Sequence, residues 1–434
     1  MTMEVLSIIL LVMKGSKMNE GVLPSYPLKE WCCDKMTNSL ILKGITVLEE
    51  DSTIENGYIR IEKGIITSIG ECSDLLDEKG LEIYDFSNFQ PSYTAVLGFI
   101  DLHIHGVNGS DTMDASLDAM KNMCNSLPRE GTTAFLPTTL TQSEDAINRA
   151  LKSVAEYKKE QMIDGSGEAE ICGIHLEGPF ILPSKAGAQP VQYIMLPSEE
   201  TFQRWQETAE GMIKLVTMAP EVEGGMDFVQ KISSKGVVVS LGHTDATFQE
   251  VERAVEHGAS QVTHLYNQMR GLHHREPGVV GAALTLNELK AEIICDEIHI
   301  HPQVVKATFL AKGVNGLLLI TDSMRGKGLE DGTYDFGRQE VTVTCDTVLL
   351  SDGTLAGSVV GMDEAVRNVM KFTGCTLRDA IQMASTNPAR QIGVFDRKGS
   401  LKVGKDADIV ILDNEHNVIM TFCKGKLARR YPDS

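Results

Sequence analysis

Apolar runs rich in β-branched residues recur through the middle of the chain, and each ends at a turn signal or a polar residue. Such runs predict buried strands. Segments with an amphipathic or polar helical pattern separate most of them, for example residues 145–160 and 248–257. Eight strands are predicted, and they begin near Leu97, Thr132, Ile171, Ile213, Val237, Gln261, Ala291 and Gly316.

Alternation of strands and helices is typical of the α/β class, in which helices cover a parallel sheet. Eight strand–helix units that close on themselves form a (β/α)8 TIM barrel. We therefore expect residues 93–394 to form such a barrel, with its last helices at 362–373 and 377–384.

Both ends of the chain carry a different pattern. Residues 40–96 contain short runs of alternating apolar and polar positions punctuated by glycine, and the same texture returns at 407–412 and 418–422. This alternation is typical of half-buried strands. We expect residues 36–92 and 395–434 to pair into one small β-sandwich, with the barrel inserted between them.

The first 35 residues show no usable period. The apolar run at residues 5–13 is too short to span a bilayer and lacks both a basic start and a clear small-residue cleavage site. We interpret residues 1–35 as an N-terminal extension, disordered or belonging to a non-native start, with a cryptic signal peptide as the alternative.

Charge and cysteine content narrow the class of protein. The net charge of −20 argues against a general nucleic-acid binder, which needs a basic face. An anionic small substrate stays possible, because a few Arg and His residues can make a positive pocket. Nine scattered cysteines without a C-x-x-C pair disfavour a disulfide or zinc-finger framework and fit a reducing compartment. We expect a cytoplasmic protein with no nucleic-acid or membrane partner.

Imidazole and carboxylate side chains stand at the carboxyl ends of five predicted strands, which in a barrel form the catalytic rim. Two histidines that lie two apart on one strand point to the same face. A glutamate that ends the third strand can bridge them to the histidines of the fifth and sixth strands. The six residues are His103, His105, Glu177, His243, His264 and Asp322.

These six side chains together predict a metal centre. Neutral imidazole and carboxylate suit zinc or iron, and open positions are typical of catalytic sites. Any one of them alone is better explained as a satisfied core histidine or a solvated carboxylate. An aspartate at a strand end beside a metal is placed to take a proton from water and return it to a leaving amine.

Short motifs that run in one order along residues 38–426 carry a family resemblance. They are G-F-I-D-L-H-I-H, G-I-H-L-E-G-P-F, M-A-P-E, G-H-T-D-A-T, T-H-L-Y-N-Q-M, R-E-P-G, D-E-I-H, I-T-D-S and L-A-G-S. With them the chain resembles the amidohydrolase superfamily and, within it, the N-acetylglucosamine-6-phosphate deacetylase family. The resemblance implies hydrolysis of that phosphorylated amino sugar to glucosamine 6-phosphate and acetate, and a homodimer.

The same resemblance implies roles for individual residues. Glu177, His243 and His264 match metal ligands, and Asp322 matches the catalytic acid/base. Some members lack the first-strand histidine pair; this chain has both, so one or two divalent ions, zinc or iron, are expected. Arg275 matches the residue that grips the substrate phosphate. Substrate contacts are implied for Ala188, Gln189, Asn267, Gln268, Arg275, His299, Leu355, Ala356 and Gly357.

Three alternatives stay open from the residues. Another hydrolase or deaminase of the amidohydrolase superfamily would act on a different amide, a cyclic amide or an aminated base. Glu177, where many of those enzymes use a carbamylated lysine, argues against it together with Arg275. A non-catalytic barrel is disfavoured, because buried unpaired carboxylates and imidazoles are costly without a metal. Arg275 can also be a solvent-facing loop residue paired to Glu276, and His273 or His274 can serve a neighbouring subunit.

Overall fold

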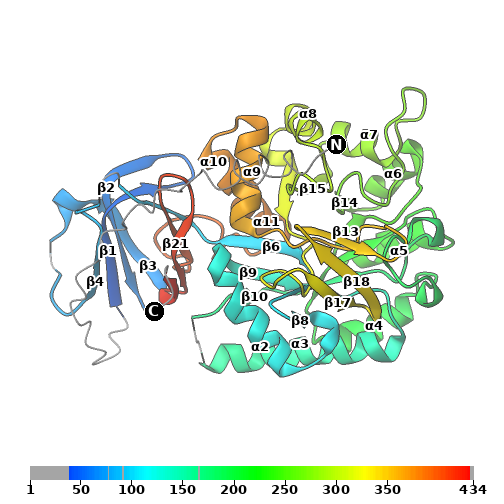
Figure 1. Ribbon diagram of the computed structural model, residues 1–434, viewed down its shortest axis with the longest axis horizontal. Coiled ribbons are helices and arrows are strands. Elements are labelled where there is room, and N and C mark those ends of the chain that lie inside the picture. Colours follow the sequence, from blue (N-terminus) through cyan, green and yellow to red (C-terminus); the bar gives the residue numbers. More distant parts are fainter. Residues whose placement is uncertain (1–38, 77, 90–91, 165–166, 431–434) are drawn as a thin grey trace, which may run out of the picture. The chain divides into compact units, whose positions relative to one another are not determined.

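Short parallel strands form the centre of the computed structural model, which describes residues 39–76, 78–89, 92–164 and 167–430 (Figure 1). They make a three-stranded sheet in the order β10-β9-β6 and a six-stranded sheet that runs from β11 to β16. Our expectations for residues 1–35 lie outside the described residues. The bounds are β6 Phe99–Ile104, β9 Thr132–Pro137, β10 Glu170–Ile171, β11 Ile174–Glu177, β12 Ile213–Met218, β13 Val238–Leu241, β14 Ala259–Val262, β15 Lys290–Ile294 and β16 Leu317–Ile320.

Two isolated bridges link the two parallel sheets. Isolated parallel bridges join Thr138 to His175 and Ile104 to Ser323. Each of the eight predicted strands is present, but the third is split. Cys172 and Gly173 separate β10, which pairs with β9, from β11, which pairs with β12. A Cβ atom on Gly173 would lie 2.8 Å from the Lys214 side chain, so a larger residue at this break would require Lys214 to move.

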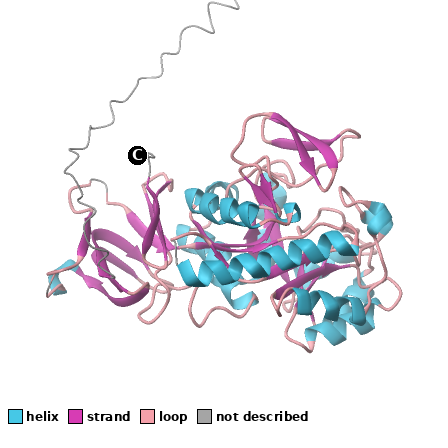
Figure 2. Cartoon of the chain, turned by 90° about the horizontal axis from the view of Figure 1, so that it is seen from below, coloured by secondary structure: helices cyan, strands magenta, loops and turns pink. Residues whose placement is uncertain are grey.

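Helices surround the parallel strands (Figures 1 and 2). Their apolar faces pack inward; in α6, for example, Val251 and Ala254 are buried. A capping box between Thr247 and Glu250 begins that helix by satisfying two free backbone N–H groups. The helices are α2 Leu117–Ser126, α3 Glu144–Asp164, α4 Glu199–Thr208, α5 Gly225–Ser233, α6 Phe248–Glu256, α7 Gly278–Thr285, α8 Pro302–Lys312, α9 Met362–Thr373, α10 Leu377–Ile381 and α11 Asn387–Gln391. Within the described ranges, none of them combines the length and apolar character needed to cross a membrane.

Strands from both ends of the chain form one sheet in the order β22-β21-β20-β5-β1-β2-β3, with β4 paired to β1. The two ends meet where β20 runs antiparallel to β5, with Ile409 opposite Leu97. The barrel was expected to begin at residue 93, but β5 belongs to the terminal sheet, and Gly98 separates it from β6. The bounds are β1 Ser39–Leu48, β2 Thr53–Glu62, β3 Ile65–Glu71, β4 Glu82–Asp85, β5 Thr94–Leu97, β20 Ile409–Leu412, β21 Val418–Cys423 and β22 Lys426–Arg430.

A small antiparallel sheet follows β16 and was not predicted. It consists of β17 Gly332–Phe336, β18 Gln339–Thr344 and β19 Thr347–Leu350. Val341, Val343 and Val348 pack with Leu140 and Met324 in a separate apolar cluster. Phe336 at the end of β17 belongs to this cluster, which brings its ring to the carboxyl ends of the parallel strands.

Candidate metal centre and active site

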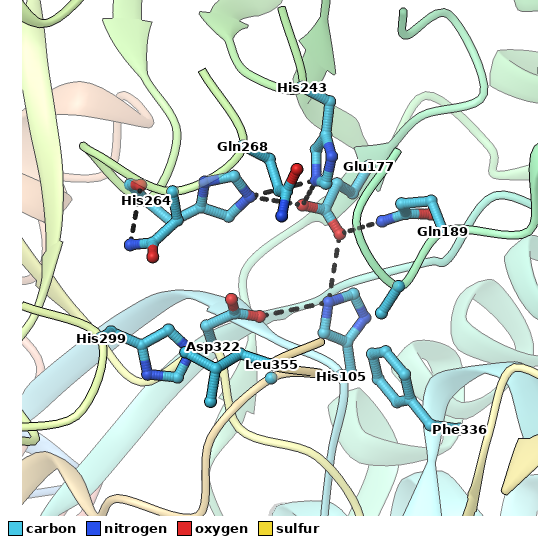
Figure 3. A pocket seen from close by; sticks show the side chains of 13 residues that line it. His105, Glu177, Gln189, His243, His264, Gln268, His299, Asp322, Phe336 and Leu355 are labelled. Carbon is cyan, nitrogen blue, oxygen red and sulfur yellow. Dashed lines mark hydrogen bonds and ion pairs between the residues drawn. The ribbon is translucent and has the colours of Figure 1, made fainter. Parts of the chain in front are cut away.

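All six polar residues predicted at strand ends meet in one buried cluster. Figure 3 shows this cluster without His103. His103 lies within β6 and Glu177 ends β11. His105 follows β6, while His243, His264 and Asp322 follow β13, β14 and β16. The carboxyl ends of parallel strands lie at one rim, so residues far apart in sequence converge there.

Glu177 lies between the two histidine pairs. Its Oε1 is 3.2 Å from Nε2 of His243, 3.3 Å from Nε2 of His264 and 3.4 Å from Nε2 of His103. Its Oε2 is 3.2 Å from Nε2 of His105. The carboxylate can therefore contribute one oxygen to each of two neighbouring cation positions.

Asp322 faces the first histidine pair, with Oδ1 3.3 Å from Nε2 of His103 and 3.4 Å from Nε2 of His105. Its backbone has a φ of 49°, and His243 and His264 have φ of 50° and 30°. Non-glycine residues adopt this region at a cost on the order of 1–3 kcal/mol, and such strain clusters at functional sites. Backbone hydrogen bonds hold Asp322 there: its N–H donates to the His103 carbonyl, and its carbonyl accepts from the Ser358 N–H, both at 2.8 Å.

The donor atoms fit a divalent cation. Nε2 of His243 and Nε2 of His264 face each other at 3.1 Å beside the Glu177 carboxylate. Nδ1 of His243 lies 2.8 Å from the Lys185 carbonyl, so it carries the proton and leaves Nε2 with its lone pair. Nε2 of His103 makes no hydrogen bond within the described chain, although it is buried. Imidazole and carboxylate donors in this arrangement suit zinc or iron.

His175 belongs to a third group of donors, with His103 and Glu292, but it is not free to bind a cation. Its Nε2 lies 2.7 Å from Oγ1 of Thr217, and its Nδ1 lies 3.2 Å from the Leu102 carbonyl. Burial and the neighbouring His103 hold the pKa of His175 well below its usual value. His175 is therefore a buried, neutral residue whose two ring nitrogens both have hydrogen-bond partners.

Without a bound cation, protons balance the charge of the cluster. Burial opposes the charged form of His105, but the Asp322 and Glu177 carboxylates outweigh it and raise its pKa to about 9. Burial likewise favours neutral Asp322, yet His103 and His105 lower its pKa to about 2. A divalent cation takes the place of these protons when it binds.

The stability of the ion-free protein should consequently depend on pH. Because the pKa of His105 is raised from 6.5 to about 9, its contribution is complete below pH 6.5 and disappears as the pH rises through 9. We expect the Tm of chelator-treated protein to fall over that interval and the Tm of ion-loaded protein to change less. Thermal unfolding of both forms across the interval checks this. An ion-free Tm that stays constant would contradict the assigned charge balance.

A cavity opens above the cluster (Figure 3). Seven of the nine predicted substrate residues line it, whereas Arg275 and Ala356 do not. Ala356 is buried behind the wall. The lining residues are His105, Glu177, Ala188, Gln189, His243, His264, Asn267, Gln268, His299, Asp322, Phe336, Leu355 and Gly357.

Arg275 lies on an exposed loop, where its Nη1 is 2.7 Å from Nε2 of His274. The alternative interpretation, a pairing with Glu276, is not what the structure has. Oε1 of Glu276 instead accepts hydrogen bonds from the backbone N–H groups of Phe248 at 3.0 Å and Gly278 at 3.1 Å. Among the described residues, no carboxylate forms an ion pair with the Arg275 guanidinium group.

Two polar residues of the cavity are oriented by neighbours. Gln189 donates from Nε2 to Oε2 of Glu177 at 2.8 Å, and its Oε1 accepts from the Thr141 N–H at 2.7 Å. Nδ1 of His299 lies 2.6 Å from Oδ2 of Asp296. Burial lowers the pKa of His299, but the Asp296 carboxylate outweighs it and raises that pKa. Gln189 thus fixes the bridging carboxylate, and His299 can present a hydrogen-bond donor to the cavity.

Phe336 is a cavity residue that sequence reasoning missed. Its ring stands edge-on to His105, with centroids 5.3 Å apart and planes at 89°. The alternation in residues 332–336 is a strand signal, but no sequence feature says that this strand folds back over the rim.

A family model described as the amidohydrolase family matches residues 94–428. The N-acetylglucosamine-6-phosphate deacetylase of Bacillus subtilis (strain 168) is 46% identical over 394 residues, which cover 91% of this chain and 98% of that protein. The N-acetylgalactosamine-6-phosphate deacetylase of Escherichia coli O157:H7 is 35% identical, with 89% of this chain and 99% of that protein covered.

Solved structures of similar proteins extend the likeness to the fold. The N-acetylglucosamine-6-phosphate deacetylase of Thermotoga maritima has a TM-score of 0.78 at 33% identity, with 90% of this chain and 100% of that chain covered. A mutant of the Mycobacterium smegmatis enzyme in complex with N-acetyl-D-glucosamine-6-phosphate has a TM-score of 0.82 at 27% identity, with 90% and 99% covered. This chain therefore belongs to the amidohydrolase family and, within it, to the N-acetylglucosamine-6-phosphate deacetylases.

Proposed function

We propose that this protein hydrolyses the acetamide of N-acetylglucosamine 6-phosphate to glucosamine 6-phosphate and acetate. The observation that carries the proposal is the cluster of four imidazoles and two carboxylates at the base of the cavity. Family membership supports the same reaction, because a relative that is 46% identical bears that enzyme's name.

Different residues would bind the metal and transfer the proton during hydrolysis. A divalent cation held by the His and Glu side chains would lower the pKa of a water molecule and polarise the acetamide carbonyl. Asp322, whose Oδ1 faces Nε2 of His103 and Nε2 of His105, would accept the proton that this water loses. The water oxygen bonds to the acyl carbon, the C–N bond breaks, and Asp322 returns the proton to the departing amine nitrogen.

The cavity walls suggest how the sugar is held. We assign the polar contacts to Asn267, Gln268 and His299, and the wall around the acetyl methyl group to Leu355 and Phe336. Arg275 is our candidate for the phosphate, because guanidinium binds phosphate through two parallel hydrogen bonds. Its exposed loop would reach the phosphate either by moving or from the second subunit of a homodimer.

We also propose how the two sheets of the fold are closed and where the protein is located. We infer that the parallel strands close as a (β/α)8 barrel over about residues 98–394, and that the terminal sheet folds as a small β-sandwich. We place the protein in the cytoplasm, which supplies phosphorylated sugars.

For the metal centre we propose two ions, zinc or iron, on either side of Glu177. His105→Ala should lower the content by about one ion per chain and leave the other in place, because His243 and His264 do not depend on it. Elemental analysis of the purified variant measures this. His243→Ala should be worse for activity, and unchanged metal content in His105→Ala would count against a second ion.

Substrate identity is tested by following acetate and amine release from N-acetylglucosamine 6-phosphate and from its C4 epimer, N-acetylgalactosamine 6-phosphate. We expect acetate and amine to be released in equal amounts. We expect kcat/KM to be higher for N-acetylglucosamine 6-phosphate than for its epimer. A higher kcat/KM for N-acetylgalactosamine 6-phosphate, the sugar in the name of the 35% identical relative, would overturn the assigned sugar but not the deacetylation reaction.

A further inference from the structure

Glu292 is a fully buried carboxylate that the proposed reaction does not use. It lies in the middle of β15, between the buried apolar residues Ala291 and Ile293. Throughout the described part of the chain, its ion-pair partner is the imidazole of His103 and no Lys or Arg side chain. A buried carboxylate without a cationic partner is costly, so its contacts call for an explanation.

Glu292 contacts one histidine of each pair in the cluster. Its Oε2 lies 3.0 Å from Nδ1 of His103 and accepts a hydrogen bond from the backbone N–H of His264, also at 3.0 Å. Its Oε1 accepts from Nε2 of Gln261 at 2.6 Å. One carboxylate oxygen thus touches a histidine side chain on β6 and the backbone of a histidine that follows β14.

We propose that Glu292 is a positioning residue that prepares His103 and His264 to bind metal ions. This proposal rests on the two-ion centre described above. A carboxylate at Nδ1 requires the proton of neutral His103 to sit on that nitrogen, which leaves Nε2 with its lone pair. That Nε2 is the atom that points at Glu177 and Asp322, 3.4 Å and 3.3 Å away.

The second contact has a separate purpose. His264 has a φ of 30°, a conformation that a non-glycine residue keeps only when its surroundings hold it. The hydrogen bond from its N–H to Glu292 is one such restraint, and the bond from the Asn267 N–H to its carbonyl at 2.9 Å is another. Glu292 therefore ties the ligand geometry of one ion position to that of the other.

Metal content measures this role without relying on turnover. We would titrate ion-free Glu292→Gln and Glu292→Ala with Zn²⁺ and record ions bound per chain, the affinity of each and the Tm. Glu292→Gln keeps the shape and an accepting oxygen but loses the charge. Replacing such a partner of a metal ligand weakens binding by about 10- to 100-fold. We expect Glu292→Gln to bind the ion at His103 and His105 at least about tenfold more weakly. Glu292→Ala, which also loses the hydrogen bond from the His264 N–H, should bind both ions more weakly than the wild type.

Glu170→Gln is the matched control, because it makes the same change to a buried strand carboxylate that pairs with Lys398 and Arg397 instead of the cluster. It should lower the Tm and keep the ion content and affinities of the wild type. A role for Glu292 in stability alone predicts that its variants behave like this control, and that result would overturn the proposal.

His105→Ala, measured in the same titration, distinguishes a failure of the two-ion centre from a failure of the role proposed for Glu292. Loss of an ion in His105→Ala with wild-type ion affinities in the Glu292 variants overturns the role of Glu292 and leaves the two-ion centre standing. Unchanged ion content and affinities in all of these variants overturn both. If Glu292→Ala does not fold, Glu292→Gln decides alone, by the affinity of its more weakly bound ion.

Discussion

Asp322→Asn should fold, bind its ions and lose about 10²- to 10⁴-fold in kcat. The backbone of Asp322 is held by hydrogen bonds to His103 and Ser358 that the amide does not disturb. Asparagine is nearly isosteric but cannot accept a proton from water and return it to the amine. The loss should therefore appear in kcat, with little change in KM.

Steady-state kinetics of the purified variant, together with its metal content, check this prediction. Asp118→Asn is a suitable control, because it removes the same charge from an exposed position at the start of α2. Activity of Asp322→Asn within a few-fold of the wild type would show that another group moves the proton.

Arg275→Ala should lower kcat/KM for N-acetylglucosamine 6-phosphate by about a hundredfold or more, because a charge-assisted bidentate contact contributes on the order of a few kcal/mol. The same change should have little effect on plain N-acetylglucosamine, which has no phosphate. Arg275→Lys should recover only part of the loss, since ammonium restores the charge but not the planar fork.

The comparison of two sugars decides between the interpretations of Arg275. Arg149→Ala, at an exposed position of α3, controls for the loss of one positive charge. Equal losses on both sugars in Arg275→Ala would mean that the residue supports its loop and that the phosphate binds elsewhere.

The sequence predicted helices and strands best where the hydrophobic pattern and a nearby turn or cap residue indicated the same boundary. Helix α9 has the bounds that its pattern indicated, Met362–Thr373, because an amphipathic run ends at Gly374, whose φ of 78° suits a helix end. The split between β10 and β11 could not be predicted, because β10 pairs with β9 and β11 pairs with β12, and no local pattern names these partners.

Candidate ligands were recognisable because they follow apolar runs, and parallel strands bring such ends together. Glu292 was missed although a charged residue inside a predicted buried strand is itself a signal. Its partner His103 is 189 positions away, and no local pattern names it. Phe336 reaches the cavity from a small antiparallel sheet, and Arg275 lies on an exposed loop that does not line the cavity. The periods of strands and helices predict neither position.

The central claim is that a metal-dependent site cleaves the acetamide of a phosphorylated amino sugar. It is tested most directly by the rate of acetate release from N-acetylglucosamine 6-phosphate and from N-acetylglucosamine, each with native, chelator-treated and Zn²⁺-restored protein. We predict fast release from the phosphorylated sugar, much slower release from the other, loss of both with chelator, and recovery with Zn²⁺. Undiminished release from protein shown to be free of metal, or equal rates for the two sugars, would contradict the claim.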